Sequence, residues 1–148
     1  MPYPEKVRND LQSLEERFQL LDDLNGAAEL LMWDRQTYMP PKGAQARGRQ
    51  STALETVAHE RLADKAVGEW LARLEESELE PLDRRLVELC RKRHDRAAKL
   101  PARFVERLSA TRSEAQQAWL DAREKRDHAV FAPHLQKLMG LVREQAQY

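Results

Sequence analysis

The sequence contains one half of a zinc-binding motif, in the stretch His59-Glu60-Arg61-Leu62-Ala63. A zinc helix of the His-Glu-x-x-His type needs two imidazoles on one helical face, with the glutamate as general base. Ala63 stands at the second ligand position, so this segment cannot supply two imidazoles to one metal ion. We therefore predict an ordinary histidine near the end of a helix, and we expect no metal ligands in this chain.

The remaining side chains that could do chemistry also lack the partners that a site needs. The other histidines have no second ligand at a suitable spacing; they are His94, His128 and His134. Cys90 lies one helical turn from Leu86 on an apolar stripe, which favours a packed thiol over a nucleophile. Paired carboxylates lie on densely charged helical faces, as in Asp22-Asp23, Glu15-Glu16 and Glu75-Glu76. We assign no catalytic residue to this chain.

Composition and charge exclude several classes of partner. The 25 basic and 25 acidic residues give a formal net charge of zero, which argues against nucleic acid as the main partner. A basic stretch from Arg91 to Lys99 is diluted by Asp95 and neighbouring acids. No apolar run reaches the length of a membrane span, and the N-terminus lacks the apolar core of a signal peptide. We predict a cytoplasmic protein that binds neither nucleic acid nor membrane.

Helical periodicity runs through almost the whole sequence, and no alternating stretch predicts a strand. Charged residues make up 34%, Gly and Pro are sparse, and helix-forming residues dominate. Short connections between the last helices favour antiparallel neighbours. The sequence therefore predicts an all-α fold, a bundle of about five or six helices with mostly antiparallel neighbours and no sheet, as a single helical region over residues 1–148.

Prolines and a capping aspartate divide this region into helices. We expect helices over about Pro4–Arg35, Pro41–Ala63, Lys65–Glu76 with Asp64 as N-cap, Pro81–Lys99, Pro101–Arg126, and from Phe131 onward. The apolar stripes predict inward positions that include Leu11, Leu14, Phe18 and Leu21; Val57 and Leu62; Val67, Leu71 and Leu74; Leu82, Leu86, Leu89 and Cys90; Phe104, Leu108, Trp119 and Ala122; and Leu135, Leu138, Val142 and Ala146. No stop signal follows Val142, so we expect the chain to end inside an amphipathic helix.

The segment from Trp33 to Arg47 combines rare residue types in an order that helical periodicity alone does not require. One interpretation is that it organises the fold: Trp33 and Met39 anchor the end of the first helix, Pro40 and Pro41 redirect the chain, Asp34 accepts a bond from an arginine or from free amides, and Thr37 caps the turn. The other interpretation places Arg35, Tyr38 or Arg47 at the rim of a substrate groove. The sequence does not separate the two.

The pattern Trp33-Asp34-x-x-Thr37-x-Met39-Pro40-Pro41-x-Gly43-Ala44-x-Ala46-Arg47 resembles the N-terminal signature of the carboxypeptidase Taq family. The resemblance continues through Leu100-Pro101, Ser113 to Trp119 and Phe131-Ala132-Pro133. It implies a helical, metal-dependent carboxypeptidase that releases C-terminal residues from peptides. The family's metal, zinc or cobalt, is held by a His-Glu-x-x-His helix and a later glutamate, which this chain lacks.

The resemblance thus implies the N-terminal wall or lid of a larger metallocarboxypeptidase, without catalytic residues or cofactor of its own. Its implied partners are the remainder of that protein, a peptide substrate in the groove, and a second copy in a homodimer. A function of a different class stays open, namely a stand-alone helical module that presents an apolar groove to a partner helix.

Overall fold

The structure, a computed structural model, describes residues 3–148 and is built from helices. Their bounds are α1 Glu5–Thr37, η1 Pro41–Gly43, α2 Ala44–Leu62, α3 Lys65–Glu75, α4 Pro81–Ala98, α5 Ala102–Lys125, η2 His128–Val130 and α6 Ala132–Gln145. No strand occurs among the described residues. The all-α prediction is confirmed, with six α-helices at almost the expected bounds within residues 3–148.

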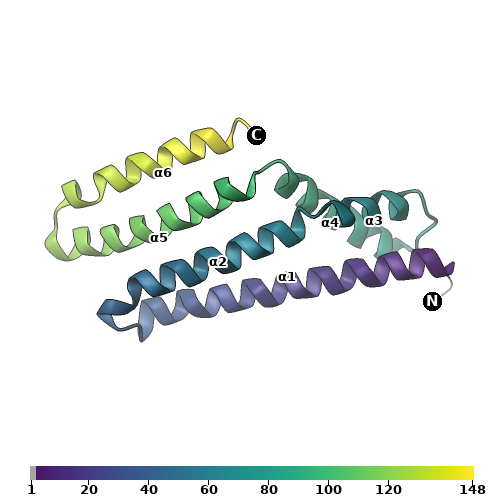
Figure 1. Ribbon diagram of the computed structural model, residues 1–148, viewed down its shortest axis with the longest axis horizontal. Coiled ribbons are helices and arrows are strands. Elements are labelled where there is room, and N and C mark those ends of the chain that lie inside the picture. The colour runs from purple at the N-terminus through teal and green to yellow at the C-terminus, as the bar shows by residue number, and fades with distance from the viewer. Residues whose placement is uncertain (1–2) are drawn as a thin grey trace.

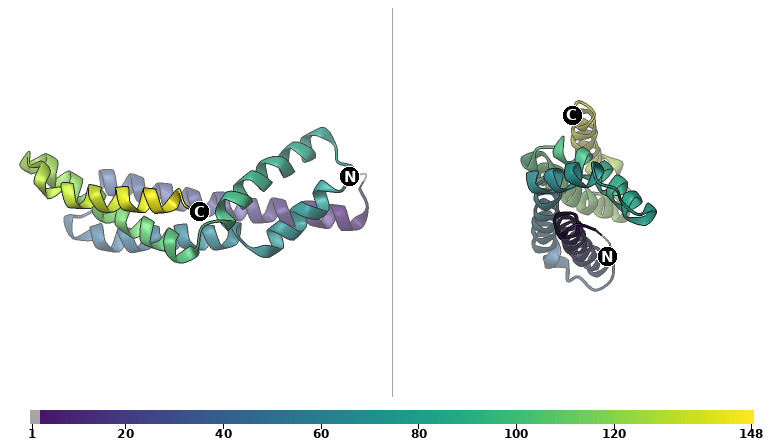
Figure 2. Two further views of the ribbon diagram at one scale, coloured as in Figure 1. Left: turned by 90° about the horizontal axis from the view of Figure 1, so that it is seen from above. Right: turned by 90° about the vertical axis from the view of Figure 1, so that its right-hand side faces the viewer.

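Four long helices lie side by side in the order α1, α2, α5 and α6, each antiparallel to the next (Figure 1). At the other end of the molecule, α3 packs on the N-terminal half of α1, and α4 packs on α3 and α2. The molecule is also elongated when it is seen from above, and the end-on view shows the helices along their axes (Figure 2). The expected all-α bundle with antiparallel neighbours is confirmed, and its long helices lie in an extended row.

Local signals explain where the helices begin. The Asp64 carboxylate accepts a hydrogen bond from the Ala66 amide at 3.0 Å, and this contact caps α3 as predicted. Pro81 is the first residue of α4, where its missing N–H costs nothing. Pro101 instead takes the N-cap position just before α5, one residue earlier than the first-turn position we expected.

The larger hydrophobic core lies at the end where α3 and α4 meet α1. It consists of Leu11, Leu14, Phe18, Leu21, Val67, Leu71, Leu74, Leu79, Val87 and Cys90. Each of these large side chains contributes about 1.5–3 kcal/mol on full burial. A smaller cluster joins α5 to α6 through Phe104, Leu108 and Leu141. Helix α2, which lies between the two clusters, has no fully buried residue, so the middle of the molecule is thinly packed.

Several predicted inward positions are wrong. On α4 the buried face is formed by Val87, Cys90, His94 and Ala97, and the leucines at 82 and 89 lie on a different face, with Leu82 81% exposed. Large side chains expected inside are exposed in the same way at Val57, Trp119, Leu135 and Val142, and Ala146 is exposed beyond the end of α6. The reason is that these helices carry apolar residues on more faces than the neighbouring helices cover.

Candidate functional site

The Trp33 to Arg47 segment forms the end of α1, the turn and the start of α2. Arg47 Nε donates to Asp34 Oδ2 at 2.6 Å, and Arg47 Nη1 donates to Gln50 Oε1 at 2.8 Å. The Asp34 backbone carbonyl accepts the amide of Tyr38 at 3.0 Å and that of Met39 at 2.8 Å. The side chain of Asp34 thus ties the end of α1 to α2, and its backbone carbonyl closes the turn.

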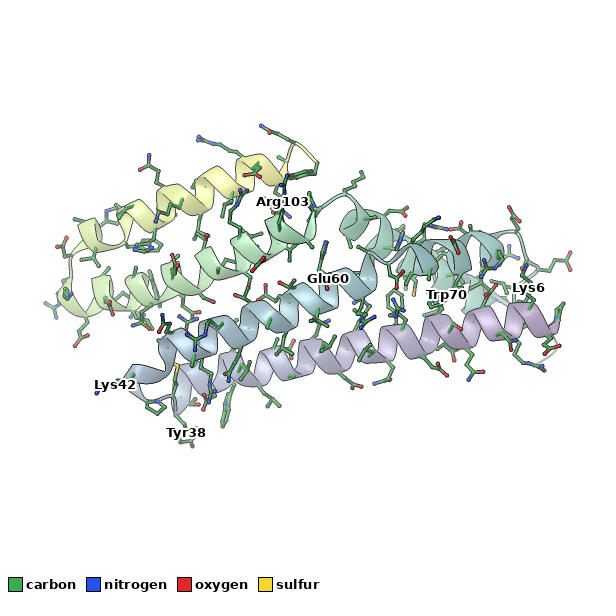
Figure 3. All side chains as sticks on the ribbon, viewed as in Figure 1. Lys6, Tyr38, Lys42, Glu60, Trp70 and Arg103 are labelled. Carbon is green, nitrogen blue, oxygen red and sulfur yellow. The ribbon has the colours of Figure 1, made fainter. Side chains whose placement is uncertain are left out.

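The aromatic residues of this segment face solvent. Trp33 is 55% exposed and Tyr38 75% exposed, and their rings meet edge to face with centroids 5.4 Å apart. Tyr38 points away from α2 at the closed end of the α1–α2 hairpin, where Lys42 also lies (Figure 3). Within the described residues Trp33 therefore does not anchor the helix end, contrary to the sequence-based expectation.

The remaining turn residues act on the local backbone. Thr37 Oγ1 donates to the Trp33 carbonyl at 2.8 Å inside α1, so it does not cap a free amide as we expected. Pro40 precedes η1 in extended conformation and Pro41 is its first residue. The Met39 side chain lies against Gly43, where an added Cβ would come within 2.9 Å of Met39 Cγ. Met39 thus fills the inside of the turn and requires a glycine opposite it.

Helices α2 and α5 meet through small and polar residues. An added Cβ at Gly48 would lie 3.3 Å from Ser113 Cβ, so the two backbones approach closely at this point. One turn further along, Ser109 Oγ donates to Thr52 Oγ1 at 3.2 Å. Because these side chains are short, they leave space beside the contact.

That space is a trough of about 920 Å³ between α2 and α5. Its α2 side is formed by Ala44, Gln45, Gly48, Arg49, Thr52, Ala53, Thr56 and Val57, its α5 side by Glu106, Ala110, Ser113, Glu114 and Gln117, and Arg35 reaches it from α1. A volume of this size is ordinary for a ligand site, and apolar walls with few polar groups are typical of one. The trough is larger than the cavity of about 270 Å³ that lies beside Leu74, Leu79 and Val87.

Arg35 is the charged group of the trough with the least access to water. Its Nη2 donates to the Ser113 carbonyl at 2.7 Å, while its Nε is buried without a hydrogen-bond partner among the described residues. Burial lowers the pKa of Arg35, because water no longer stabilises the cation fully. The hydroxyl of Thr56 is likewise buried without a partner. Unpaired polar groups on the wall of a cavity indicate a binding surface.

The predicted site residues are thus only partly brought together. Arg35 lines the trough, whereas Tyr38 and Arg47 do not. Sequence reasoning missed the residues of α2 and α5 that form the walls. A signal was present, since small residues recur every fourth position of α2 at Ala44, Gly48, Thr52 and Thr56. This spacing places them on one helical face.

The donor set does not fit a metal ion. Among residues 3–148, no group of three or more His, Cys, Asp or Glu side chains comes close enough together to hold one. His59 Nε2 lies 2.8 Å from the Leu100 carbonyl, and His94 is buried against Gly68. The trough offers cation, hydroxyl and carbonyl groups but no paired base and nucleophile. Its residues are suited to binding, and we derive no reaction step from them.

Comparison with known proteins identifies the family. The family model described as carboxypeptidase Taq (M32) metallopeptidase matches residues 13–148. Because this match covers most of the chain, the protein belongs to the carboxypeptidase Taq family of metallopeptidases. The resemblance drawn from the Trp33 to Arg47 motif is confirmed.

Individual relatives agree with this assignment. Thermostable carboxypeptidase 1 of Thermus thermophilus is 33% identical over 97% of this chain and 28% of its own length. Thermostable carboxypeptidase 1 of Pyrococcus furiosus is 32% identical over 82% of this chain and 25% of its own length. The crystal structure of an M32 carboxypeptidase from Deinococcus radiodurans superposes with a TM-score of 0.74 at 33% identity, over 95% of this chain and 28% of that one. The chain thus spans little more than a quarter of the length of these relatives.

No helix among the described residues is long and apolar enough to cross a membrane.

Proposed function

We propose that this chain is the N-terminal helical region of a metal-dependent carboxypeptidase that releases C-terminal amino acids from peptides. In this role residues 1–148 form the wall or lid of the substrate groove, and the metal site lies in another part of the longer protein. The observation that carries the proposal is the family match over residues 13–148, combined with relatives of which the chain spans only about 28%.

The surface of the chain supports this proposal. Large apolar side chains are exposed along the second half of α1, at Leu30, Met32 and Trp33, and along one face of α6, at Leu135, Met139 and Val142. Exposed apolar faces of this kind mark surfaces that another protein segment covers.

The finer features of the proposal follow from the family. The metal of the longer protein is zinc or cobalt, its substrate is a peptide, and the enzyme is a cytoplasmic homodimer. Arg35 lies on the groove wall in this arrangement, and Tyr38 and Arg47 lie at its outer rim. The Asp34–Arg47 pair then holds the end of the α1–α2 hairpin in position, and the exposed rings of Trp33 and Tyr38 lie beside it.

Two experiments test this proposal, namely sequencing of the gene and assays of the isolated chain. We expect the reading frame to continue beyond Tyr148 into a His-Glu-x-x-His helix with a later glutamate. We also expect the isolated chain to bind no stoichiometric zinc in equilibrium dialysis and to release no C-terminal residue from a blocked dipeptide, as followed by mass spectrometry. Chelator-sensitive hydrolysis by the chain alone would contradict the placement of the catalytic groups.

The exposed apolar faces also favour a second candidate, a helical interaction module without catalysis. The two candidates differ in what covers those faces. Self-association of the chain that disappears when the rest of the enzyme is supplied supports the carboxypeptidase region. A chain that stays monomeric and ignores the rest of the enzyme supports the module. Sedimentation velocity with and without the separately expressed remainder gives the answer.

A further inference from the structure

Helix α2 lies in the middle of the row of long helices, yet none of its residues is fully buried. Within the described part of the chain it packs against α1 on one side and α5 on the other, and more weakly against α4. Its wall of the trough, from Ala44 to Val57, stays open. A helix inside a folded protein buries an apolar stripe against its neighbours. The open wall therefore indicates that α2 has a further neighbour.

Arg35 extends from α1 to this open wall and carries an unpaired positive charge. No ion pair among residues 3–148 involves it. Its Nη2 donates to the Ser113 carbonyl at 2.7 Å, and its Nε is buried without a hydrogen-bond partner in that part of the chain. Because the planar guanidinium binds carboxylates most strongly, the group that completes this site is a carboxylate.

The Arg35 contact lies near one end of the trough. Ser113, which accepts the bond, faces Gly48, where an added Cβ would lie 3.3 Å from Ser113 Cβ. Gly48 is about one turn from Ala44 at this end, and the wall continues for about 14 Å in the other direction, to Val57. The neighbour therefore places its carboxylate near one end of the trough and covers the longer part, which is mostly apolar, with apolar side chains.

A second copy of this chain does not suit the trough. Two concave surfaces cannot fill each other across a two-fold axis. The exposed apolar side chains that could enter a trough lie on other helices, at Leu30 and Met32 of α1 and at Leu135 of α6. A contact between such different surfaces is heterologous, and it builds a ring or an open filament instead of a closed dimer.

A transient ligand such as a peptide substrate leaves the trough empty between binding events. Arg35 Nε and the Thr56 hydroxyl would then stay without a hydrogen-bond partner, and each unpaired buried group costs about 1–3 kcal/mol. A neighbour that is always present removes this cost. The chain covers only 28% of its relative from Thermus thermophilus, so in a protein of that length the rest of the same polypeptide can supply the neighbour.

We propose that a segment of the same polypeptide beyond Tyr148 lies in the α2–α5 trough and pairs one of its carboxylates with Arg35. This inference rests on the proposed function, because it requires the longer protein. Apolar residues of the segment cover the wall from Gly48 to Val57, and a polar group of the segment meets the Thr56 hydroxyl. Arg35 thus joins the groove wall to the rest of the enzyme and does not contact the substrate.

The test uses the longer protein, expressed from the gene that encodes this chain. The variant Arg35→Lys places a primary amine at the proposed ion pair, and a carbodiimide then couples this amine to a contacting carboxylate without a spacer. Arg49→Lys, at an exposed position of the same wall, is the matched control. Peptide mapping by mass spectrometry identifies the linked residues. A mixture of unlabelled and 15N-labelled protein separates links within one chain from links between two chains.

We expect the amine at position 35 to be linked to one carboxyl group beyond residue 148 of the same chain. The linked fraction should be about tenfold or more larger than for Arg49→Lys, because an exposed side chain forms only weak ion pairs. A link to a second copy, a link only to Glu106 or Glu114 of the trough, or no link would each overturn the proposal. Equal linking of the control to the same carboxyl group would overturn it as well.

A photoreactive benzophenone amino acid at position 57 gives a second measurement, which decides even where Arg35→Lys fails to fold. We expect it to label the same segment within about ten residues of the linked carboxyl group, since the wall from Gly48 to Val57 is about 14 Å long. Labelling of a second copy or of an added peptide substrate, or no labelling, would count against the segment. A reading frame that stops after Tyr148 would refute the proposed function itself. A longer protein that hydrolyses peptides but gives neither link would refute this inference alone.

Discussion

Arg47 on α2 holds Asp34 near the end of α1 through a 2.6 Å bond from Nε to Oδ2. Both side chains are about a quarter to a third exposed, with 31% for Arg47 and 26% for Asp34. The pair closes the α1–α2 hairpin near the C-terminal end of α1, beyond the last buried residue of that helix, Leu21. It is the side-chain ion pair that joins the two helices at the turn in which the family motif lies.

Loss of this pair should loosen the turn more than it destabilises the whole fold. We expect Arg47→Met to lower the free energy of unfolding by only about 0.5–1 kcal/mol, because half-exposed ion pairs are screened by water. Amide hydrogen exchange should accelerate from Asp34 to Gln50 and stay unchanged around Leu71. Uniformly faster exchange in both regions would show that the pair stabilises the entire chain.

The pair of Asp10 and Arg73 predicts how stability depends on pH. Asp10 is 8% exposed, and Arg73 donates to both of its carboxylate oxygens at 2.7 Å. These bonds hold the pKa of Asp10 below its ordinary value. A carboxyl whose pKa falls on folding stabilises the fold above its unfolded pKa of about 3.9, and this contribution disappears as the pH falls through the folded pKa.

We therefore expect Asp10→Asn to lower the free energy of unfolding by about 1–2 kcal/mol at pH 7, because the amide keeps only part of the hydrogen bonding. The difference from the unaltered chain should shrink as the pH is lowered from 5 toward 2. Urea titrations across this range measure it, with the exposed Glu29→Gln on the same helix as control. A constant difference at all pH values would contradict the assigned cause.

Two helical glycines should respond to alanine in opposite directions. At Gly26, in the interior of α1, an added Cβ meets no atom within 4 Å, so Gly26→Ala should stabilise the chain by about 0.5–1 kcal/mol through helix propensity alone. At Gly68, in α3, the same Cβ would lie 3.1 Å from His94 Cε1 and 3.3 Å from its Nε2. His94 is buried and cannot move freely, so Gly68→Ala should destabilise.

Thermal unfolding monitored by circular dichroism distinguishes these outcomes. The melting temperature should rise for Gly26→Ala and fall for Gly68→Ala relative to the unaltered chain. A rise for both variants would mean that α3 and α4 are less closely packed at His94 than the distances indicate.

The helix boundaries were predictable because proline and capping signals act locally. Asp64 and Pro81 mark the starts of α3 and α4 whatever surrounds them. The buried face of α4 was not predictable, because Leu82 and Leu89 form one apolar face and Val87 and Cys90 another. Which face is buried depends on α1 and α3, and a single helix does not encode it.

The Trp33 to Arg47 motif was recognisable in the sequence, whereas the trough beside it was not predicted. The motif is recognisable by its rare residues, but the walls consist of small residues that normally indicate close helix packing. Arg35 was named from the motif, yet only the folded structure shows that its Nε is buried without a hydrogen-bond partner among residues 3–148. Whether a buried polar atom has a partner depends on the packing of several helices, so the sequence alone does not show it.

The orientation of α4 gives a prediction that separates its two apolar faces. Val87 is buried in the main core, whereas Leu82 is 81% exposed. We expect Val87→Ala to cost about 1–3 kcal/mol through lost contacts and a residual cavity. Leu82→Gln should change the free energy of unfolding by less than about 0.5 kcal/mol. Urea denaturation of the two variants, with unchanged slopes, tests this orientation, and the reverse order of effects would rule it out.

The single cysteine reports on the same core by its reactivity. Burial raises the pKa of the Cys90 thiol to about 11, because the thiolate would lose its hydration there. At pH 8.5 the thiol therefore stays protonated, and iodoacetamide should modify it about a hundredfold or more slowly than it modifies the chain in urea. Labelling followed by intact-mass spectrometry measures both rates. The reaction requires transient opening of α4. Val87→Ala should therefore accelerate the labelling, and Leu82→Gln should leave its rate unchanged. Fast labelling of the unaltered chain would show that Cys90 lies outside the core.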